Sequence, residues 1–280
     1  MAKIKDFQKF KGFFEYNYDR LFSNYYVHFH FLNKLEELNK GTIVAHRAFN
    51  VVDDEGNDII FIWVSNCCYL YSNNWTPEMV SLLLAEIQFS RFTKHFEFAG
   101  QKDLIEEVLN AAKASYQTHK DRLVYKINKV SSGIDNIIGE VFNATLLDFD
   151  DILDLSMQNY EEEYQGMGQR TKDQMAGGLM VGINTNNLFV LRKSGRIESI
   201  VQLISTEEDR PIIGNLFTRK ESRNKGYAFK LLHTVSKGLL DNGYEDLGLF
   251  SDATNPASNA VFNKIGYEAI YKFSIFFITD

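Results

Sequence analysis

The order of strands and helices predicted for the first half of the chain returns in the second half. Each half is expected to hold a hairpin, a third strand, a helix, a fourth strand, a second helix and a final strand. Matching elements lie about 145 to 152 residues apart: Thr42 with Asn187, Pro77 with Tyr227, Phe96 with Leu247 and Leu123 with Tyr271. A constant offset with the same element order indicates a tandem duplication, although two unrelated α/β domains would alternate similarly.

Turn signals mark the same places in the two halves. Residues Asp53–Asp58 separate the two strands of the first hairpin, and Lys193–Gly195 separate those of the second. We therefore expect an α/β (α+β) fold with two tandem domains, residues 1–132 and 133–280, joined near Ser131–Gly133.

The composition is that of an ordinary folded protein without a basic excess. The chain has 280 residues, with 30 Lys and Arg, 37 Asp and Glu, and a net charge of −7. Because proteins that neutralise phosphates are normally basic, no nucleic-acid partner is expected. No apolar run approaches a membrane span, and the charged start lacks the apolar stretch of a signal peptide. The sequence therefore predicts a soluble cytoplasmic protein without a membrane partner.

The two cysteines, Cys67 and Cys68, are adjacent. Neighbours in one strand point to opposite faces and make a poor disulfide. Two cysteines without spacing also form no metal site, so we expect reduced thiols and no metal.

The stretch from Gly214 to Ala228 carries the clearest chemical signal. A predicted strand runs into a loop with four basic residues between Arg219 and Lys225, and then directly into an amphipathic helix. Helix N-termini offer free N–H groups and a positive dipole end, and Gly226 lets a ligand approach the backbone. The pattern indicates a cradle for a diphosphate, whereas the alternative is a solvated loop before a helix.

A second segment follows about thirty residues later. Asn255 is the expected cap of a short helix, Pro256 its first residue and Gly266 its stop. Alone, this segment predicts only a well-capped helix.

Together the two segments resemble the GNAT superfamily of acyl-CoA-dependent N-acyltransferases. Arg223-x-x-Gly226-x-Ala228 is similar to its Arg/Gln-x-x-Gly-x-Gly/Ala phosphate loop. The stretch from Asn255 to Tyr267 is similar to its Asn-x-x-Ser-x-x-x-Tyr/Phe-x-x-x-Gly-Phe/Tyr segment. The resemblance covers about Val141 to the C-terminus and implies tandem GNAT-like domains, each a mixed, mostly antiparallel sheet flanked by helices.

The resemblance also implies a place for acetyl-CoA, or another acyl-CoA, as co-substrate. Its pantetheine arm would pair with a strand that is splayed from its neighbour, and the Phe217 backbone N–H would stabilise the oxyanion. Asn255 would hydrogen-bond the arm and Phe262 would pack beside it. The implied cofactor-binding residues are Leu216, Phe217, Thr218, Arg223, Asn224, Lys225, Gly226, Tyr227, Ala228, Asn255 and Phe262.

The sequence departs from the family pattern in its proton chemistry. Phe262 stands where the family often has a Tyr that protonates the leaving thiolate. A thiolate of pKa near 8.5 leaves tolerably without a strong acid. Glu207 is a candidate general base just before the key strand, although such acidic runs usually form a solvated turn. Tyr160, Tyr164 and Glu161–Glu163 are candidates for the acceptor wall.

The first half lacks these features. Ser72–Trp75 stands where the cradle should be and has neither the glycine nor the basic residues. We expect a degenerate copy without a cofactor site.

These observations favour an N-acyltransferase that moves an acetyl group to a primary amine by direct attack in a ternary complex. The alternative is a non-catalytic acyl-CoA-binding sensor or scaffold. A P-loop phosphotransferase is disfavoured because no Gly-x-x-x-x-Gly-Lys-Ser/Thr occurs. The acceptor amine and the oligomeric state stay open.

Overall fold

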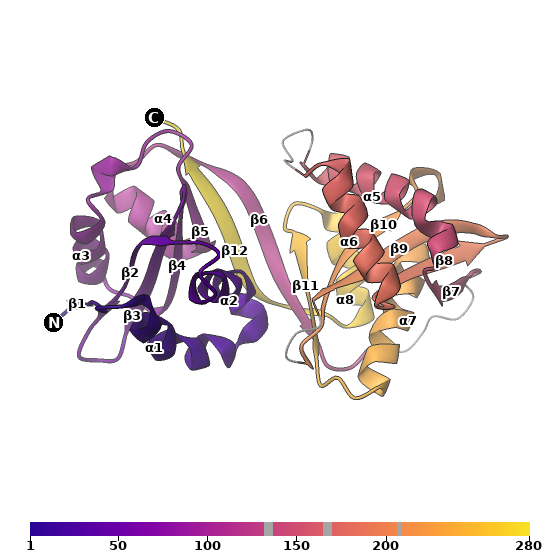
Figure 1. Cartoon of the computed structure of the whole chain (residues 1–280), viewed down its shortest axis with the longest axis horizontal. Coiled ribbons are helices and arrows are strands. Elements are labelled where there is room, and N and C mark those ends of the chain that lie inside the picture. The colour runs from indigo at the N-terminus through magenta and orange to yellow at the C-terminus, as the bar shows by residue number, and fades with distance from the viewer. Residues whose placement is uncertain (132–136, 165–169, 206–208) are drawn as a thin grey trace. The chain divides into compact units, whose positions relative to one another are not determined.

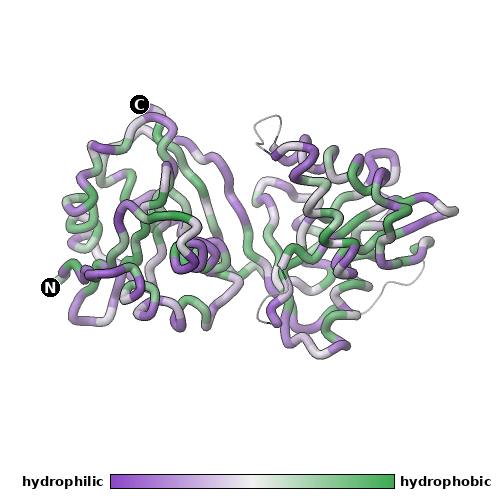
Figure 2. Tube along the Cα trace, in the orientation of Figure 1, coloured by the Kyte–Doolittle hydropathy of each residue, from purple (hydrophilic) through white to green (hydrophobic). Residues whose placement is uncertain are grey.

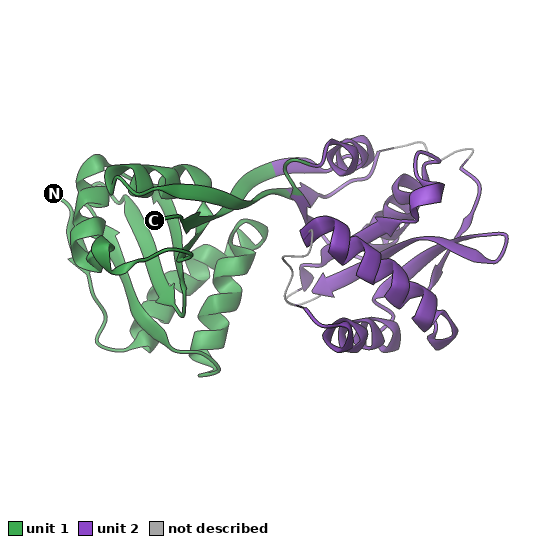
Figure 3. Ribbon diagram, turned by 90° about the horizontal axis from the view of Figure 1, so that it is seen from above, with its two compact units in different colours: residues 1–124, 252–254, 270–280 green, residues 125–251, 255–269 purple. Residues whose placement is uncertain are grey.

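The structure is a computed structural model that describes residues 1–131, 137–164, 170–205 and 209–280. The chain divides into two compact units (Figure 3). Unit 1 comprises residues 1–124, 252–254 and 270–280, and unit 2 comprises residues 125–251 and 255–269. Each unit has an apolar core of its own.

Unit 1 starts with a short strand and two helices, followed by the predicted hairpin (Figure 1). Its elements are β1 (Lys3–Lys5), α1 (Phe10–Phe22), α2 (Tyr25–Asn39), β2 (Ala45–Val52), β3 (Asp58–Val64), β4 (Cys67–Asn74), α3 (Pro77–Ile87), a 3₁₀ turn (Phe89–Arg91), β5 (Glu97–Gln101), α4 (Lys102–Ala111) and β6 (Tyr116–Ile127). Strand β6 passes from unit 1 into unit 2 after Val124.

The sheet of unit 1 is mixed and mostly antiparallel, as predicted. Its strands follow the order β1-β2-β3-β4-β5-β12-β6, where β12 (Glu268–Ile278) is the last strand of the chain. Strands β2, β3 and β4 are antiparallel neighbours, and β4 and β5 are parallel. Strand β12 runs antiparallel to β5, with Ile275 opposite Ala99.

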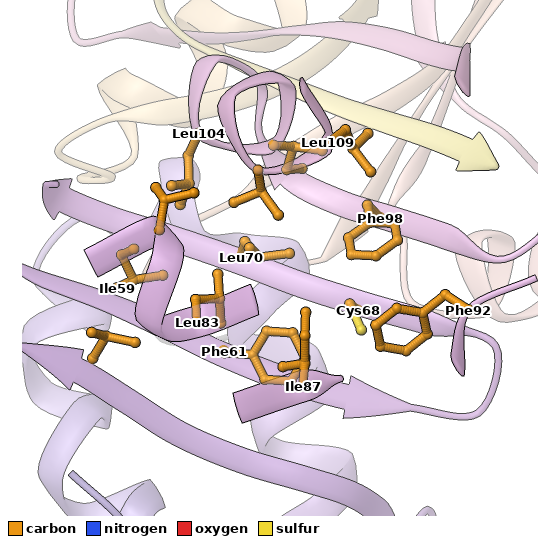
Figure 4. Packing of buried hydrophobic residues seen from close by; sticks show 14 of the residues in the cluster. Ile59, Phe61, Cys68, Leu70, Leu83, Ile87, Phe92, Phe98, Leu104 and Leu109 are labelled. Carbon is orange, nitrogen blue, oxygen red and sulfur yellow. The ribbon is translucent and has the colours of Figure 1, made fainter. Parts of the chain in front are cut away.

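Helices α3 and α4 cover one face of this sheet (Figure 4). Phe61, Leu70 and Phe98 point from three adjacent strands toward Leu83 of α3 and Leu104 of α4, and all five are fully buried. Burial of such side chains contributes roughly 1.5–3 kcal/mol each. This cluster anchors the two helices to the sheet.

Helix α2 covers the opposite face. Because side chains alternate along a strand, Tyr69 and Tyr71 of β4 point away from α3 and α4. The ring of Phe31 lies 6.4 Å from that of Tyr69, and the ring of His28 lies 4.0 Å from that of Tyr71, centroid to centroid. Burial lowers the pKa of His28 to about 3. Unit 1 therefore has three layers.

Unit 2 repeats this element order. Its elements are β7 (Glu140–Asn143), a 3₁₀ turn (Leu146–Asp148), α5 (Phe149–Tyr164), α6 (Lys172–Asn184), β8 (Leu188–Lys193), β9 (Arg196–Ser205), β10 (Ile212–Thr218), a 3₁₀ turn (Lys220–Ser222), α7 (Tyr227–Asp241), β11 (Leu247–Asp252) and α8 (Pro256–Ile265). The last residue of β11 is assigned to unit 1.

The strands of unit 2 follow the order β11-β10-β9-β8-β7, and the end of β6 lies beyond β11. Ile200 of β9 and Phe217 of β10 are buried in one cluster with residues of α5 and α6. Helix α7 packs against β8, β9 and β10, and its Leu231 and Leu232 are fully buried outside that cluster. The inner strands of both units are rich in apolar residues, whereas β6 is largely hydrophilic and the helices alternate in polarity (Figure 2), as expected for helices that cover a sheet.

The last strands of the two halves are exchanged. Each half has the final strand that the sequence predicts, but this strand lies in the other unit: β12 lies beside β5 in unit 1, and residues 125–127 of β6 lie beside β11 in unit 2. Each unit nevertheless has the same strand order, with the sixth position, next to β5 or β11, filled by a strand of the other half. The predicted fold class is confirmed, and the domain limits 1–132 and 133–280 stay a prediction.

Candidate functional site

The candidate site lies where β10 and β11 separate. These two parallel strands pair only at Ile212 with Gly248 and at Ile213 with Leu249. Strand β10 nevertheless continues to Thr218, and β11 continues to Asp252. Beyond Ile213 the facing edge of β10 therefore has no partner strand among the described residues, so its backbone groups are available to a ligand.

A β-bulge lies at this point of β10. Gly214 faces Gln202 and Phe217 faces Ile200, so two residues of β10 stand opposite one residue of β9. Asn215 takes the left-handed conformation that the bulge needs, with φ of 51°.

The side chain of Asn215 ties the bulge to α5. Its Oδ1 accepts a hydrogen bond from Asn159 Nδ2 at 2.9 Å, and its Nδ2 donates to Ser156 Oγ at 3.2 Å. Nothing in the sequence pattern singled out these three residues.

The register of β10 decides which backbone groups face the open edge. The Arg219 N–H donates to the Glu198 carbonyl of β9 at 3.0 Å. In an antiparallel pair, the backbone N–H and C=O groups of successive residues point alternately toward and away from the neighbouring strand. The N–H of Phe217 therefore also points toward β9, whereas the N–H and C=O of Thr218 point away from it. This register disfavours the oxyanion role predicted for the Phe217 N–H, and the Phe217 side chain is buried in the core.

The predicted cradle has the shape of an anion-binding nest. Asn224 and Gly226 both adopt left-handed conformations, with φ of 61° and 82°, immediately before α7. Within the described part of the chain, none of the backbone N–H groups from Asn224 to Phe229 donates a hydrogen bond. Successive free N–H groups at a helix N-terminus favour an anion.

Gly226 is required here for two reasons. Its φ is one that L side chains rarely adopt, and an added Cβ would lie 2.9 Å from Ile137 Cδ1. A bulky residue at Gly226 would therefore disturb the fold of the loop as well as any bound ligand. Because of this double effect, substitutions at Ala228 probe the cradle more cleanly.

The Arg223 side chain lies back along the end of β10. Its Nε donates to the Thr218 carbonyl at 3.2 Å, and its guanidinium carbon lies 5.1 Å from the Phe217 ring centroid. Its Nη2 donates to both carboxylate oxygens of Glu162 on α5, at 2.8 and 3.1 Å.

Glu162 also meets a second basic residue of the loop. Lys220 Nζ lies 3.2 Å from Glu162 Oε1. Partial burial opposes ionisation of this carboxylate, but the hydrogen bonds from Arg223 and Lys220 prevail and lower its pKa. Glu162 was expected only as a candidate for the acceptor wall, and its pairing with the loop has no local sequence signal.

The buried carboxylate of Glu198 is hydrogen-bonded to the loop between β10 and α7. Glu198 is 7% exposed and accepts a hydrogen bond from the hydroxyl of Ser222, which is 3% exposed. On the outer side, Lys225 Nζ donates to the Glu221 carbonyl at 2.9 Å. The sequence signal for Glu198 is that a glutamate stands within an otherwise apolar predicted strand.

Helix α8 begins as the sequence predicts. The side-chain Oδ1 of Asn255 accepts a hydrogen bond from the Ser258 N–H at 3.1 Å, and among the described residues the side-chain N–H₂ of Asn255 has no acceptor. Phe262 is buried, and its ring centroid lies 5.5 Å from that of Tyr125. The hydroxyl of Tyr267 lies 2.8 Å from Ser236 Oγ, and burial raises its pKa well above the usual value.

Other predicted candidates have different surroundings. Glu207 lies outside the described residues. The hydroxyl of Tyr160 accepts a hydrogen bond from the Arg170 N–H at 2.8 Å, and its ring lies 4.6 Å from that of Tyr164.

In unit 1 the strands that correspond to β10 and β11, which are β4 and β5, leave no comparable open edge. Strands β4 and β5 pair at four successive positions, and Gly100 is so close to β4 that an added Cβ would lie 2.0 Å from the Leu70 carbonyl oxygen. The Gln101 side chain accepts from the Ser72 N–H at 2.9 Å. Helix α3 is capped by its own Thr76.

Three further features bear on the predicted partners. In the described ranges, no group of three or more His, Cys, Asp or Glu could hold a metal ion. Within the same ranges, no helix has the length and apolar character needed to cross a bilayer.

Cys67 and Cys68 are both free thiols, and burial raises the pKa of Cys67 to about 12.

Comparisons with known proteins agree with the resemblance. Residues 191–275 match the family model described as FR47-like protein. No curated protein sequence matches the chain.

Several solved structures have a similar fold. A GCN5-related N-acetyltransferase from Sphaerobacter thermophilus is 13% identical with a TM-score of 0.61, over 87% of this chain and 84% of that chain. A GNAT-family acetyltransferase from Colwellia psychrerythraea is 14% identical with a TM-score of 0.59, over 99% and 100%. A GCN5-related N-acetyltransferase from Kribbella flavida is 9% identical with a TM-score of 0.51, over 88% and 93%. The chain therefore has the fold of the GNAT superfamily, and its residues 191–275 also carry the sequence pattern of the FR47-like family.

Proposed function

We propose that unit 2 binds an acyl-CoA and transfers its acyl group to an amine. The observation that carries this proposal is the run of free N–H groups from Asn224 to Phe229, which starts one loop after the unpaired edge of β10. A CoA ester needs both features, because it combines a diphosphate with an extended, amide-containing arm. Acetyl-CoA as the donor and a primary amine as the acceptor are the narrower form of the proposal.

The residues present fit a CoA ester. The diphosphate would rest on the N–H groups between Arg223 and Ala228, where a left-handed Gly226 leaves the backbone accessible. The arm would run along Leu216–Thr218, with the free Asn255 amide as a further donor. Phe262 would pack beside its thiol end.

The Thr218 N–H is our proposal for the oxyanion donor, in place of Phe217. It belongs to the open edge of β10, and a backbone N–H fixed by a ladder costs little reorganisation when charge develops on the thioester oxygen. The neutral amine nitrogen would attack the thioester carbon to form the C–N bond, and the C–S bond would break to release the CoA thiolate. The nitrogen would lose its extra proton to water or to that thiolate, which leaves the neutral amide and CoA.

Phe262 has no hydroxyl group that could protonate the leaving thiolate. The hydroxyl of the nearby Tyr267 is hydrogen-bonded to Ser236. A thiolate of pKa about 8.5 leaves without full protonation. An alkylammonium acceptor of pKa about 10.4 must first lose a proton, and Glu207 stays the proposed base.

The test is release of CoA thiol from acetyl-CoA, followed with a thiol reagent in the presence of a panel of primary amines. We expect release that depends on both the protein and an amine, with the N-acetyl product seen by mass spectrometry. Tight CoA binding without release for any amine would favour the non-catalytic sensor or scaffold. Absence of CoA binding would refute the proposal.

A further inference from the structure

We propose that Glu162 is an internal competitor of the acyl-CoA diphosphate: it holds the cations of the phosphate loop and must be displaced when the cofactor binds. The inference rests on the proposed function of unit 2. It makes Glu162 a positioning residue, which acts through Arg223 and sets the affinity for the cofactor.

The first argument is that one carboxylate engages two cations of the loop. Glu162 contacts Arg223 Nη2 through both oxygens, at 2.8 and 3.1 Å, and Lys220 Nζ at 3.2 Å. A diphosphate on the adjacent N–H groups would attract the same two side chains, because a guanidinium binds phosphate and carboxylate with the same fork of N–H groups.

The second argument is that Arg223, when paired with Glu162, occupies a backbone group that the cofactor would need. The guanidinium Nε donates to the Thr218 carbonyl, a backbone group on the open edge of β10. An amide of a pantetheine arm along β10 would need that same carbonyl. For the arm to lie there, Arg223 must turn away from β10, and its bonds to Glu162 oppose this movement.

The third argument is that the contact is weak enough to break. The Arg223, Lys220 and Glu162 side chains are 41%, 64% and 35% exposed. Ion pairs this exposed contribute little to stability and are screened by salt. A contact of this strength lowers cofactor affinity without abolishing it.

The contact also joins the cofactor loop to α5. Glu162 lies in the last turn of α5, and Asn159 one turn earlier bonds to Asn215 in the bulge of β10. Displacement of Glu162 by a diphosphate would release the end of α5 from the loop while its middle stays fixed to β10.

The experiment measures CoA binding to the full chain by calorimetry. Glu162→Gln keeps the size of the side chain but removes its charge, and we expect CoA to bind three- to tenfold more tightly, which corresponds to about 0.6–1.4 kcal/mol. Asp154→Asn is the matched control, because it removes the same charge from an exposed residue of α5 two turns before Glu162, and we expect less than a twofold change.

A double-mutant cycle separates this role from a structural one. In a background that carries both Arg223→Gln and Lys220→Gln, the gain from Glu162→Gln should shrink below twofold, because both cationic partners of Glu162 are then missing. Equal or weaker CoA binding by Glu162→Gln, in a wild-type protein that binds CoA, would overturn the inference and leave the proposed function standing. If neither the wild type nor any variant binds CoA, the proposed function fails and the inference fails with it.

Discussion

A negative charge placed in the first turn of α7 should separate cofactor binding from stability. Ala228 is the second residue of α7, whose first turn contains no acidic residue. The second residue of the matching helix α3 is Glu78, so Ala228→Glu gives the second half the residue of the first. A carboxylate near a helix N-terminus stabilises the helix by typically 0.3–1 kcal/mol, so the thermal midpoint should stay or rise.

The same carboxylate should repel a bound diphosphate. Two unit charges 4 Å apart interact by about 1 kcal/mol in water and about 4 kcal/mol near a protein surface. We therefore expect CoA affinity to fall at least about tenfold, or 1.4 kcal/mol, at low ionic strength. Salt should reduce the effect, because the site is open to solvent.

The control for this experiment is Ala228→Gln, which has the same length without the charge. Calorimetric titration with CoA should show a much smaller loss for Gln than for Glu, and melting curves should show that both variants are folded. Equal CoA affinity of the Glu variant and the wild type would refute the assignment of the diphosphate to this helix end.

Two further perturbations test separate parts of the account. Phe262→Tyr should leave the rate of thiol release similar or raise it, whereas Phe262→Ala should cost roughly 3 kcal/mol of unfolding free energy through lost packing; a large fall in turnover for the Tyr variant, with CoA affinity kept, would contradict this. His28 has a pKa lowered to about 3 in the folded protein, so below about pH 6.5 the unfolded chain binds a proton that the folded chain does not. Stability should therefore fall as the pH drops from 7 to 5, less so in His28→Phe, and melting curves with the same pH slope for both proteins would contradict it.

Local signals were enough to predict the first residues of α3 and α8 and the place of a glycine before α7. Thr76 and Asn255 cap their helices as expected, accepting from the N–H of Met79 and Ser258. Gly226 takes the left-handed conformation that only glycine adopts freely. Each of these features depends on residues within a few positions of one another, so the sequence contains the whole interaction.

Features that depend on distant residues were not predictable. The exchange of β6 and β12 is a choice of neighbour, and an alternating strand pattern does not say which edge a strand joins. Glu162 and Arg223 are 61 residues apart, and either could have been a solvated surface charge. The bulge at Asn215 needs the partner strand β9 to define it.

The central claim is that an acyl-CoA binds at the start of α7 in the second half of the chain. Hydrogen–deuterium exchange of the full protein, with and without CoA, tests it directly. The free N–H groups from Asn224 to Phe229 should exchange quickly alone and become protected with CoA, whereas residues 72–80 at the matching place in unit 1 should not change. Protection confined to the first half, or no protection at α7 at saturating CoA, would contradict the account.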